Sequence, residues 1–256
     1  MSESSRRLLV AGDPPPVVVE NPGGGSPLLL IGDHAGHAIP AALGDLGVSA
    51  AELRRHIALD IGVAGLGAAL APRLDAAFLH QRYSRLVIDC NRDPKHAASI
   101  PLESDGTAIP GNVELAPLAS QARAAAVFQP YHDRIAAELD ARAGAGRRTI
   151  LVSLHSFTPV LGAAPRPWRF GVLHRGDSAF SRAVLAGLRA RYGDEVGDNQ
   201  PYAMDGTDYT VPHHAGSRGL DYLELEVRQD TIADPADQTA VADVLAAVLT
   251  AALASD

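Results

Sequence analysis

Short apolar runs alternate along the chain with longer helical stretches, and this alternation constrains the fold more than any other feature. Apolar runs bounded by turn residues predict strands at residues 17–20, 28–31, 76–83, 84–92, 148–156, 169–176 and 221–230. Stretches rich in alanine and leucine predict helices at 49–74, 116–146, 178–193 and 234–254. Strands that alternate with helices predict an α/β fold, here a three-layer sandwich with a mixed, mostly parallel sheet between helices.

Local signals predict where two of these helices begin, bend and end. Ser49, with Glu52 three residues later, forms a capping box, which predicts a helix start. The 116–146 stretch contains Pro130, which predicts a kink, and it ends in a glycine-rich segment.

The first 25 residues differ from the rest of the chain. They contain Pro14–Pro16 and Gly23–Gly25, which predict an irregular lead-in over residues 1–25. Residues 26–256 show no break in composition and no internal repeat, so we predict a single α/β domain there, which carries the candidate catalytic residues.

Composition argues against several classes of protein. The net charge of −8 argues against a nucleic-acid-binding surface, which needs clustered Lys and Arg. A single cysteine, Cys90, excludes an internal disulfide and a zinc site built from thiolates, and it is typical of a cytoplasmic protein. The N-terminal residues lack the apolar stretch of a signal peptide, and no run of 18 apolar residues predicts a membrane helix.

Histidines stand at the ends of two predicted strands. Segment 26–40 reads SPLLLIGDHAGHAIP, so His34 and His37 closely follow an apolar run, and His155 lies near the end of the run at 148–156. Ligands bind beyond the carboxyl ends of strands in such sheets, and neutral imidazole is the commonest metal ligand. A catalytic zinc ion needs three protein ligands and an open fourth position. The pattern predicts a zinc site, with hydrogen bonds to backbone carbonyls as the structural alternative.

The third zinc ligand has two candidates. His37 is close to His34 in the sequence, and a loop with two histidines at this spacing can chelate a metal. Asp60 lies in the otherwise apolar segment HIALDIG, where a buried carboxylate needs a partner. That partner is either a metal ion or an arginine.

The strand predicted at 221–230 presents two glutamates on one face. Its two-residue period separates the apolar side chains from Glu224 and Glu226, which project from the opposite side. One of them could be the general base that deprotonates an attacking water. The structural alternative is an ion pair between Glu226 and Arg228 or another arginine.

Arg85, Asn91 and Arg92 flank the strand predicted at 84–92. Because the planar guanidinium group binds carboxylates in a bidentate way, Asn91 and Arg92 predict a site for a substrate carboxylate. The alternative is that the arginines pair with neighbouring aspartates. No nucleophile elbow, Walker loop or dinucleotide-binding glycine motif is present.

Together, the polar segments resemble the N-formylglutamate amidohydrolase family. The matching segments are DHAGHAIP (33–40), HIALDIG (56–62), YSRLVIDCNR (83–92), SDGTAIPGN (104–112), PYH (130–132), LHSFTPV (154–160), GDNQPY (197–202), HHAGSRGL (213–220) and LEVRQD (225–230). Each segment is short, but their number and order make the resemblance specific.

The resemblance implies a fold similar to that of zinc carboxypeptidases and aspartoacylases, with a mixed eight-stranded sheet between helices. It implies that His34 and His155 are zinc ligands and that Glu226 is the catalytic base, with Arg85 as a cation that stabilises the oxyanion. In the carboxypeptidase pattern H-x-x-E, the position of His37 holds glutamate. Asp60, which stands in a matching segment, is therefore favoured slightly over His37 as the third ligand.

For the substrate, the resemblance implies an N-acyl amino acid held by Asn91 and Arg92, with His214 and Arg228 as further binding groups in matching segments. The implied reaction is the zinc-dependent hydrolysis of N-formyl-L-glutamate to formate and L-glutamate. One alternative is a related zinc amidase or carboxypeptidase that acts on another N-acyl amino acid or a small peptide. The other is a metal-free protein that binds carboxylates.

Overall fold

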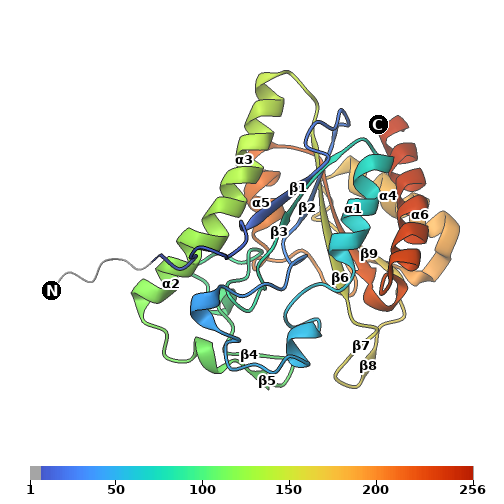
Figure 1. Cartoon of the computed structure of the whole chain (residues 1–256). Helices are drawn as coiled ribbons and strands as arrows, with labels where there is room; N and C mark the ends of the chain where they lie inside the picture. Colours follow the sequence, from blue (N-terminus) through green and yellow to red (C-terminus); the bar gives the residue numbers. More distant parts are fainter. Residues whose placement is uncertain (1–6, 256) are drawn as a thin grey trace.

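A seven-stranded sheet forms the centre of the computed structural model, which describes residues 7–255 (Figure 1). In spatial order its strands are β1 (Val17–Glu20), β3 (Ala77–Gln81), β2 (Leu28–Gly32), β6 (Ile150–Phe157), β11 (Tyr222–Arg228), β9 (Phe170–Leu173) and β10 (Val196–Asp198). The pairs β1–β3 and β11–β9 are antiparallel, and the other pairs are parallel. The predicted mixed, mostly parallel sheet is confirmed. The expectation of eight strands is wrong within residues 7–255, because the remaining short strands pair separately as hairpins.

Helices cover both faces of this sheet, as Figure 1 shows. One face packs against α1 (Val63–Arg73), α4 (Ala179–Tyr192) and α6 (Pro235–Ala254), and the other packs against α3 (Gln129–Gly144) and α5 (Thr210–His214). The side chains of β2 alternate between the two cores: Leu28 and Leu30 face the first, and Leu29 and Ile31 face the second. A strand that is apolar on both faces is the mark of a sheet covered on both sides, so the predicted three-layer sandwich is confirmed.

The helix predicted at 49–74 begins later than its capping box indicates. The Ser49 hydroxyl does accept a hydrogen bond from the Glu52 amide at 3.3 Å, but only a single 3-10 turn, Glu52–Arg54, follows it. The chain then runs through a loop to Gly62, whose φ of +85° suits glycine, and α1 starts at the next residue. Asp60 therefore lies in a loop and not within a helix.

The strand predicted at 84–92 is absent. Its apolar residues Leu86, Val87 and Ile88 are buried, but they lie in turns beneath α3 and not in the sheet. A short apolar run is ambiguous between a strand and a buried loop, since burial alone does not require a strand partner.

The helical stretch predicted at 116–146 has three parts. Helix α2 (Pro117–Arg123) continues through a π-helical segment, Ala124–Phe128, into α3. Pro130 has no amide hydrogen to bond back into the preceding turn, so the irregularity predicted for this proline takes the form of the π-helical segment directly before it. The smaller strands form two hairpins, β4 (Glu103–Ser104) with β5 (Thr107–Ala108), and β7 (Val160–Leu161) with β8 (Ala164–Pro165).

Helix α6 is long enough and apolar enough in composition to cross a membrane. Its buried residues Val241, Leu245 and Leu249 belong to the core that it shares with α1 and α4. Core helices of globular domains have this composition too, so α6 by itself is weak evidence for a membrane span.

Candidate metal centre

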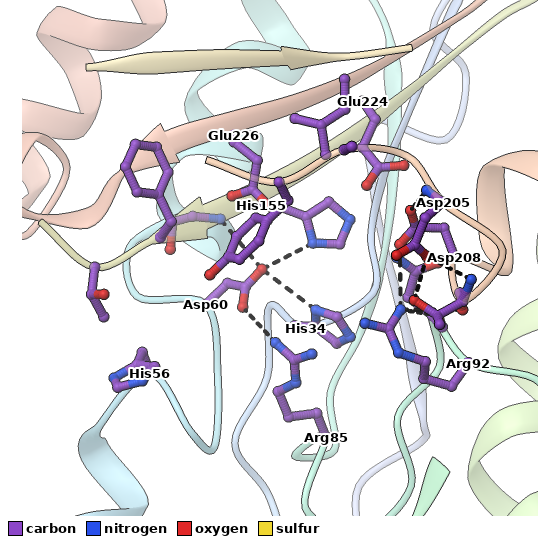
Figure 2. Close-up of a pocket in the computed structure, with 18 residues that line it drawn as sticks. His34, His56, Asp60, Arg85, Arg92, His155, Asp205, Asp208, Glu224 and Glu226 are labelled. Atoms are coloured by element: carbon purple, nitrogen blue, oxygen red, sulfur yellow. Dashed lines mark hydrogen bonds and ion pairs between the residues drawn. The ribbon is translucent and has the colours of Figure 1, made fainter. Parts of the chain in front are cut away.

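A pocket of about 300 Å³ opens at the carboxyl ends of β2, β6 and β11 (Figure 2). Its volume suits a small molecule, and this end of the sheet is the usual ligand site of α/β folds. Most of the predicted site residues line it, namely His34, Asp60, Arg85, Asn91, Arg92, His155, Glu224 and Glu226. The sheet thus brings together side chains that are up to 192 positions apart, from His34 to Glu226.

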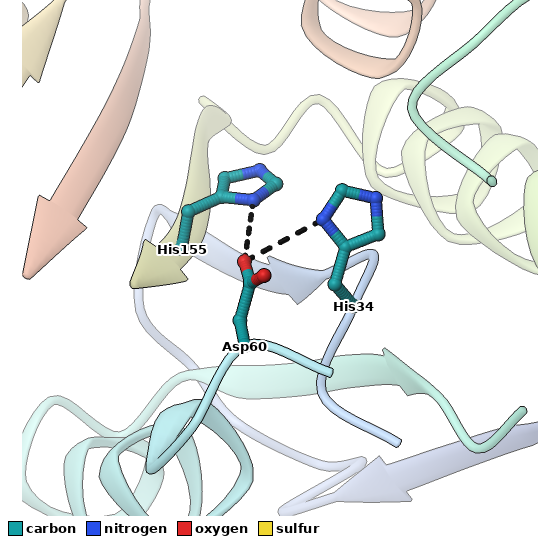
Figure 3. A group of neighbouring side chains, drawn as sticks. All are labelled: His34, Asp60 and His155. Carbon is teal, nitrogen blue, oxygen red and sulfur yellow. Dashed lines mark hydrogen bonds and ion pairs between the residues drawn. The ribbon is translucent and has the colours of Figure 1, made fainter. Parts of the chain in front are cut away.

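His34, Asp60 and His155 form a compact buried group (Figure 3). Each contributes one candidate ligand atom, and these atoms all lie within 4.8 Å of one another. His34 follows β2, and His155 lies near the end of β6. The Asp60 amide donates a hydrogen bond to the His34 carbonyl at 2.9 Å, which ties the Asp60 loop to the end of β2.

The hydrogen bonds of His34 leave one ring nitrogen available to a metal. Its Nε2 lies 2.7 Å from Asp89 Oδ1, and a carboxylate can only accept, so Nε2 carries the proton. Its Nδ1 is buried without a hydrogen-bond partner among the described residues and faces Asp60 Oδ2 at 3.5 Å. A histidine oriented by a carboxylate, with its other nitrogen free, is the usual arrangement of a zinc ligand.

His155 is held in a similar way. Its Nδ1 lies 3.0 Å from Asp60 Oδ2, and its Nε2 lies 3.5 Å from Asp33 Oδ2 and 3.0 Å from Ser153 Oγ. Burial alone would lower the pKa of His155, but the neighbouring carboxylates of Asp33 and Asp60 raise it well above the usual value. The His155 ring therefore carries a positive charge beside the Asp60 carboxylate when no metal is bound. Two imidazole nitrogens and one carboxylate oxygen match the donor set of a catalytic zinc site, so these residues fit the metal that the resemblance implies.

Asp60 has the arginine partner that was considered for it, and it also faces two histidines. Its Oδ1 accepts a hydrogen bond from Arg85 Nη1 at 3.3 Å, and its Oδ2 faces both histidines. Burial opposes the ionisation of Asp60, but the charges of His34 and His155 and the hydrogen bonds to them hold its pKa well below the usual range. Asp60 is therefore an anion that is available to a cation.

Glu224 and Glu226 project from β11 into the same pocket, and each has a buried Oε2 without a hydrogen-bond partner in the described chain. In Figure 2, Glu226 lies on the Asp60 side of His155, and Glu224 lies on the other side, near the His155 ring and towards Asp205 and Asp208. Burial raises the pKa of Glu226 to about 7 and that of Glu224 to about 8. Glu226 does not pair with Arg228, which bonds Asp230 at 2.8 Å.

Arg85 is paired with acidic residues, as the structural alternative predicted. It donates two hydrogen bonds to Asp89 Oδ2, at 2.7 and 3.2 Å, in addition to its bond with Asp60. Its side chain is nevertheless 27% exposed at the pocket wall, so its charge faces the space where a ligand would lie.

Asn91 and Arg92 are anchored to the loop that precedes α5. Asn91 Oδ1 accepts hydrogen bonds from the amides of Tyr209 and Thr210, both at 2.9 Å. Arg92 Nη1 lies 3.3 Å from Asp208 Oδ1, so its partner is a distant aspartate and not a neighbouring one. Both side chains line the pocket, with Arg92 at its edge.

Three other predicted residues lie away from the pocket. His37 is exposed and does not belong to the group formed by His34, Asp60 and His155. His214 is buried against His132, with 2.9 Å between their ring nitrogens. Arg228 lies against the segment between β8 and β9, where it donates to the Pro167 carbonyl at 3.3 Å. Neither His214 nor Arg228 lines the pocket.

The sequence reasoning missed several residues of the site. Asp33 orients His155, and the only signal for it is its position at the end of the strand, next to His34. Tyr202 and Asp208 line the pocket from a loop that has no regular structure, and no periodic pattern marks such a loop. Tyr202 does lie in one of the segments that match the family.

Gly36 fixes the path of the loop that carries His34. A Cβ added at Gly36 would overlap the backbone of Arg82, including its carbonyl, and backbone cannot move aside cheaply. We expect Gly36→Ala to destabilise the fold by about 1–3 kcal/mol, the usual cost of overpacking, in a chemical denaturation experiment. Gly23→Ala is the matched control, because a Cβ there meets nothing within 4 Å. Equal stabilities for the two variants would contradict this account of the loop.

Comparisons with known proteins find relatives of this chain over most of its length. The family model of N-formylglutamate amidohydrolase matches residues 26–233. The structure of gene product Atu2144 from Agrobacterium tumefaciens is 37% identical, covers 97% of this chain and 99% of that chain, and has a TM-score of 0.93. A comparison with curated protein sequences gives no match.

A second solved structure shows the same fold at lower identity. It is N-formylglutamate amidohydrolase from Ralstonia eutropha, which is 22% identical, covers 93% of this chain and 97% of that chain, and has a TM-score of 0.66. The family match extends from just before β2 to beyond β11, and so includes His34, Asp60, His155 and Glu226. The chain therefore belongs to the N-formylglutamate amidohydrolase family.

Proposed function

We propose that the protein is a zinc-dependent amidohydrolase that removes the acyl group from an N-acyl amino acid. The observation that carries this proposal is the group of His34, Asp60 and His155, with an unpartnered buried Nδ1, beside Glu226 in a pocket of small-molecule size. N-formyl-L-glutamate is the proposed substrate because the matching family model bears that name. The products would be formate and L-glutamate.

The metal would be held by His34, Asp60 and His155. A zinc ion in such a site lowers the pKa of water and polarises a carbonyl oxygen. The protein's own contribution begins with Asp89 and Asp33, which orient the two histidine rings.

Glu226 is the proposed general base. It takes a proton from the attacking water and later gives it to the leaving nitrogen of the amide. Burial raises the pKa of Glu226 to about 7, which suits a group that must accept and donate a proton near neutral pH. Arg85 places a positive charge at the pocket wall, where it would stabilise the oxyanion.

Arg92 is the proposed contact for a substrate carboxylate, supported by Asn91. Arg92→Lys keeps the charge but loses the planar group, so we expect KM for the best acidic substrate to rise about tenfold. Steady-state kinetics would measure this, with Arg189→Lys, on the exposed face of α4, as the control. An unchanged KM would remove Arg92 from the substrate site.

The test of the proposed function is an activity screen of the purified chain with zinc supplied. N-formyl-L-glutamate is compared with other N-formyl, N-acetyl and N-acyl amino acids and with short peptides. We expect release of formate from N-formyl-L-glutamate. Activity only on another N-acyl amino acid or peptide would indicate a related amidase or carboxypeptidase. Carboxylate binding without zinc or turnover would indicate a metal-free binding protein, and this outcome would contradict the proposal.

We also propose a cytoplasmic location. The single cysteine, Cys90, is free and buried, which accords with a reducing compartment.

A further inference from the structure

Two adjacent side chains of α3, Tyr131 and His132, contact the segments that carry Asp33 and Asp89. These are the two aspartates that lie beside the candidate zinc ligands His155 and His34. Tyr131 donates its hydroxyl hydrogen bond to Asp33 Oδ1 at 2.8 Å. The other oxygen of Asp33 forms an ion-pair contact of 3.5 Å with His155 Nε2, which also contacts Ser153 Oγ at 3.0 Å. Tyr131 is fully buried, so no water competes for this contact, and the hydroxyl fixes the rotation of the Asp33 carboxylate.

His132 is linked to His34 through the backbone at Cys90. Its Nε2 lies 2.9 Å from the Cys90 carbonyl, which can only accept, so Nε2 carries the proton. Cys90 lies between Asp89 and Asn91, and Asp89 Oδ1 accepts both the Asn91 amide at 2.8 Å and His34 Nε2. Anchoring the Cys90 carbonyl therefore anchors the turn that aims Asp89 at His34.

The hydrogen bond between His132 and His214 also has a definite direction. Burial lowers the pKa of His132 to about 4 and that of His214 to about 3, so both rings are neutral near pH 7. Since His132 Nε2 carries the proton, its Nδ1 accepts, and His214 Nε2 donates to it at 2.9 Å. The stacked rings of α3 and α5 thus form a chain of hydrogen bonds that ends on the Cys90 carbonyl.

The helix geometry places both residues against the site. Adjacent residues on an α-helix point about 100° apart, so one face seldom presents two neighbours to the same feature. Here Tyr131 and His132 are both buried, and the π-helical segment Ala124–Phe128 lies directly before α3. Such segments often occur at functional sites, because they change which side chains a helix presents.

From these contacts we infer that Tyr131 and His132 are positioning residues for the metal site: Tyr131 sets His155 through Asp33, and His132 sets His34 through the turn at Asp89. This gives a function to the segment PYH at 130–132, and it explains why His214 is buried behind the pocket and not within it. The inference rests on the proposed zinc site.

Zinc affinity tests this inference without reference to turnover. The purified chain is titrated with zinc against a chelator of known affinity, and the absorption spectrum of its cobalt form is recorded. Tyr131→Phe keeps the ring but removes the hydroxyl, and we expect its zinc Kd to rise about 10- to 100-fold, the usual effect of removing such a partner. Tyr83→Phe is the matched control, because Tyr83 is equally buried and its hydroxyl bonds the Pro14 carbonyl at 2.7 Å.

His132 is tested by a pair of variants. Gln can place a donor near the position of Nε2, whereas Phe cannot, so His132→Gln should recover zinc affinity and the cobalt spectrum, and His132→Phe should not. Thermal unfolding of the metal-free variants distinguishes a specific loss of zinc affinity from a general loss of stability. Wild-type zinc affinity and cobalt spectra in both Tyr131→Phe and His132→Phe would overturn this inference but not the proposed function. A wild-type chain that binds no zinc would overturn it together with the proposed function.

Discussion

His155→Ala is expected to abolish stoichiometric zinc binding and to lower turnover by at least about 10³-fold. The substitution removes one of the three proposed ligands, and Asp60 and His34 would remain as an incomplete pair. A metal ion at a reacting carbonyl contributes several kcal/mol of transition-state stabilisation, and each ~1.4 kcal/mol is tenfold in rate. Elemental analysis of the purified protein measures the zinc, and steady-state kinetics measures the turnover.

The fold of His155→Ala should survive, because His155 lies at the end of β6, where it faces the pocket and not the apolar core. His80→Ala is the matched control: His80 is also a buried strand histidine, but it stacks on Phe78 and does not line the pocket. Asp60→Asn and His37→Ala, made separately, distinguish the two candidates for the third ligand. Full zinc occupancy in His155→Ala would show that the site is misassigned.

Glu226→Gln is expected to lower kcat by about 10²–10⁴-fold, the range for a positioned general base, while zinc and substrate still bind. Glutamine keeps the shape of the side chain but cannot accept the proton of water. The strand supports this role, because Glu226 pairs with His155 in the register of β11 with β6 and so lies directly beside the metal group. Stopped assays of formate release would measure kcat, and zinc analysis would show that the site is intact.

Glu224→Gln is the paired control for Glu226. Glu224 lies opposite Ser153, two residues further from the end of the strand, and points towards Asp208. We expect its kcat to change far less. If only the Glu224 variant is inactive, the base is Glu224. Near-normal turnover in both variants would contradict general-base catalysis by either residue.

The sequence was sufficient to predict six of the seven strands of the sheet, all except β10, and the position of His34 and His155 at the ends of two of them. Both inferences rest on local patterns, since apolar runs predict buried strands and polar residues at their carboxyl ends meet at one edge. The two-residue period also predicted correctly that Glu224 and Glu226 share the face of β11 opposite Leu223 and Leu225.

The remaining features depend on contacts between distant segments. The Ser49 hydroxyl bonds the Glu52 amide, but the Glu52 carboxylate bonds Arg55 and Thr107 and a single 3-10 turn follows, so Asp60 lies in a loop that periodicity assigned to a helix. The apolar residues 86–88, which predicted a strand at 84–92, are buried but have no strand partner. Asp33 and His132 support the site only because α3 crosses the sheet beside them, and no spacing along the chain encodes that crossing.

The central claim is that one zinc ion at His34, Asp60 and His155 makes this chain an amidohydrolase. Its most direct test is to strip the purified protein of metal with a chelator, return zinc in measured fractions of an equivalent, and follow the hydrolysis of N-formyl-L-glutamate. The account predicts no activity without metal and a linear rise that levels off at one zinc per chain. Full activity in the metal-free protein, or none at saturating zinc, would contradict it.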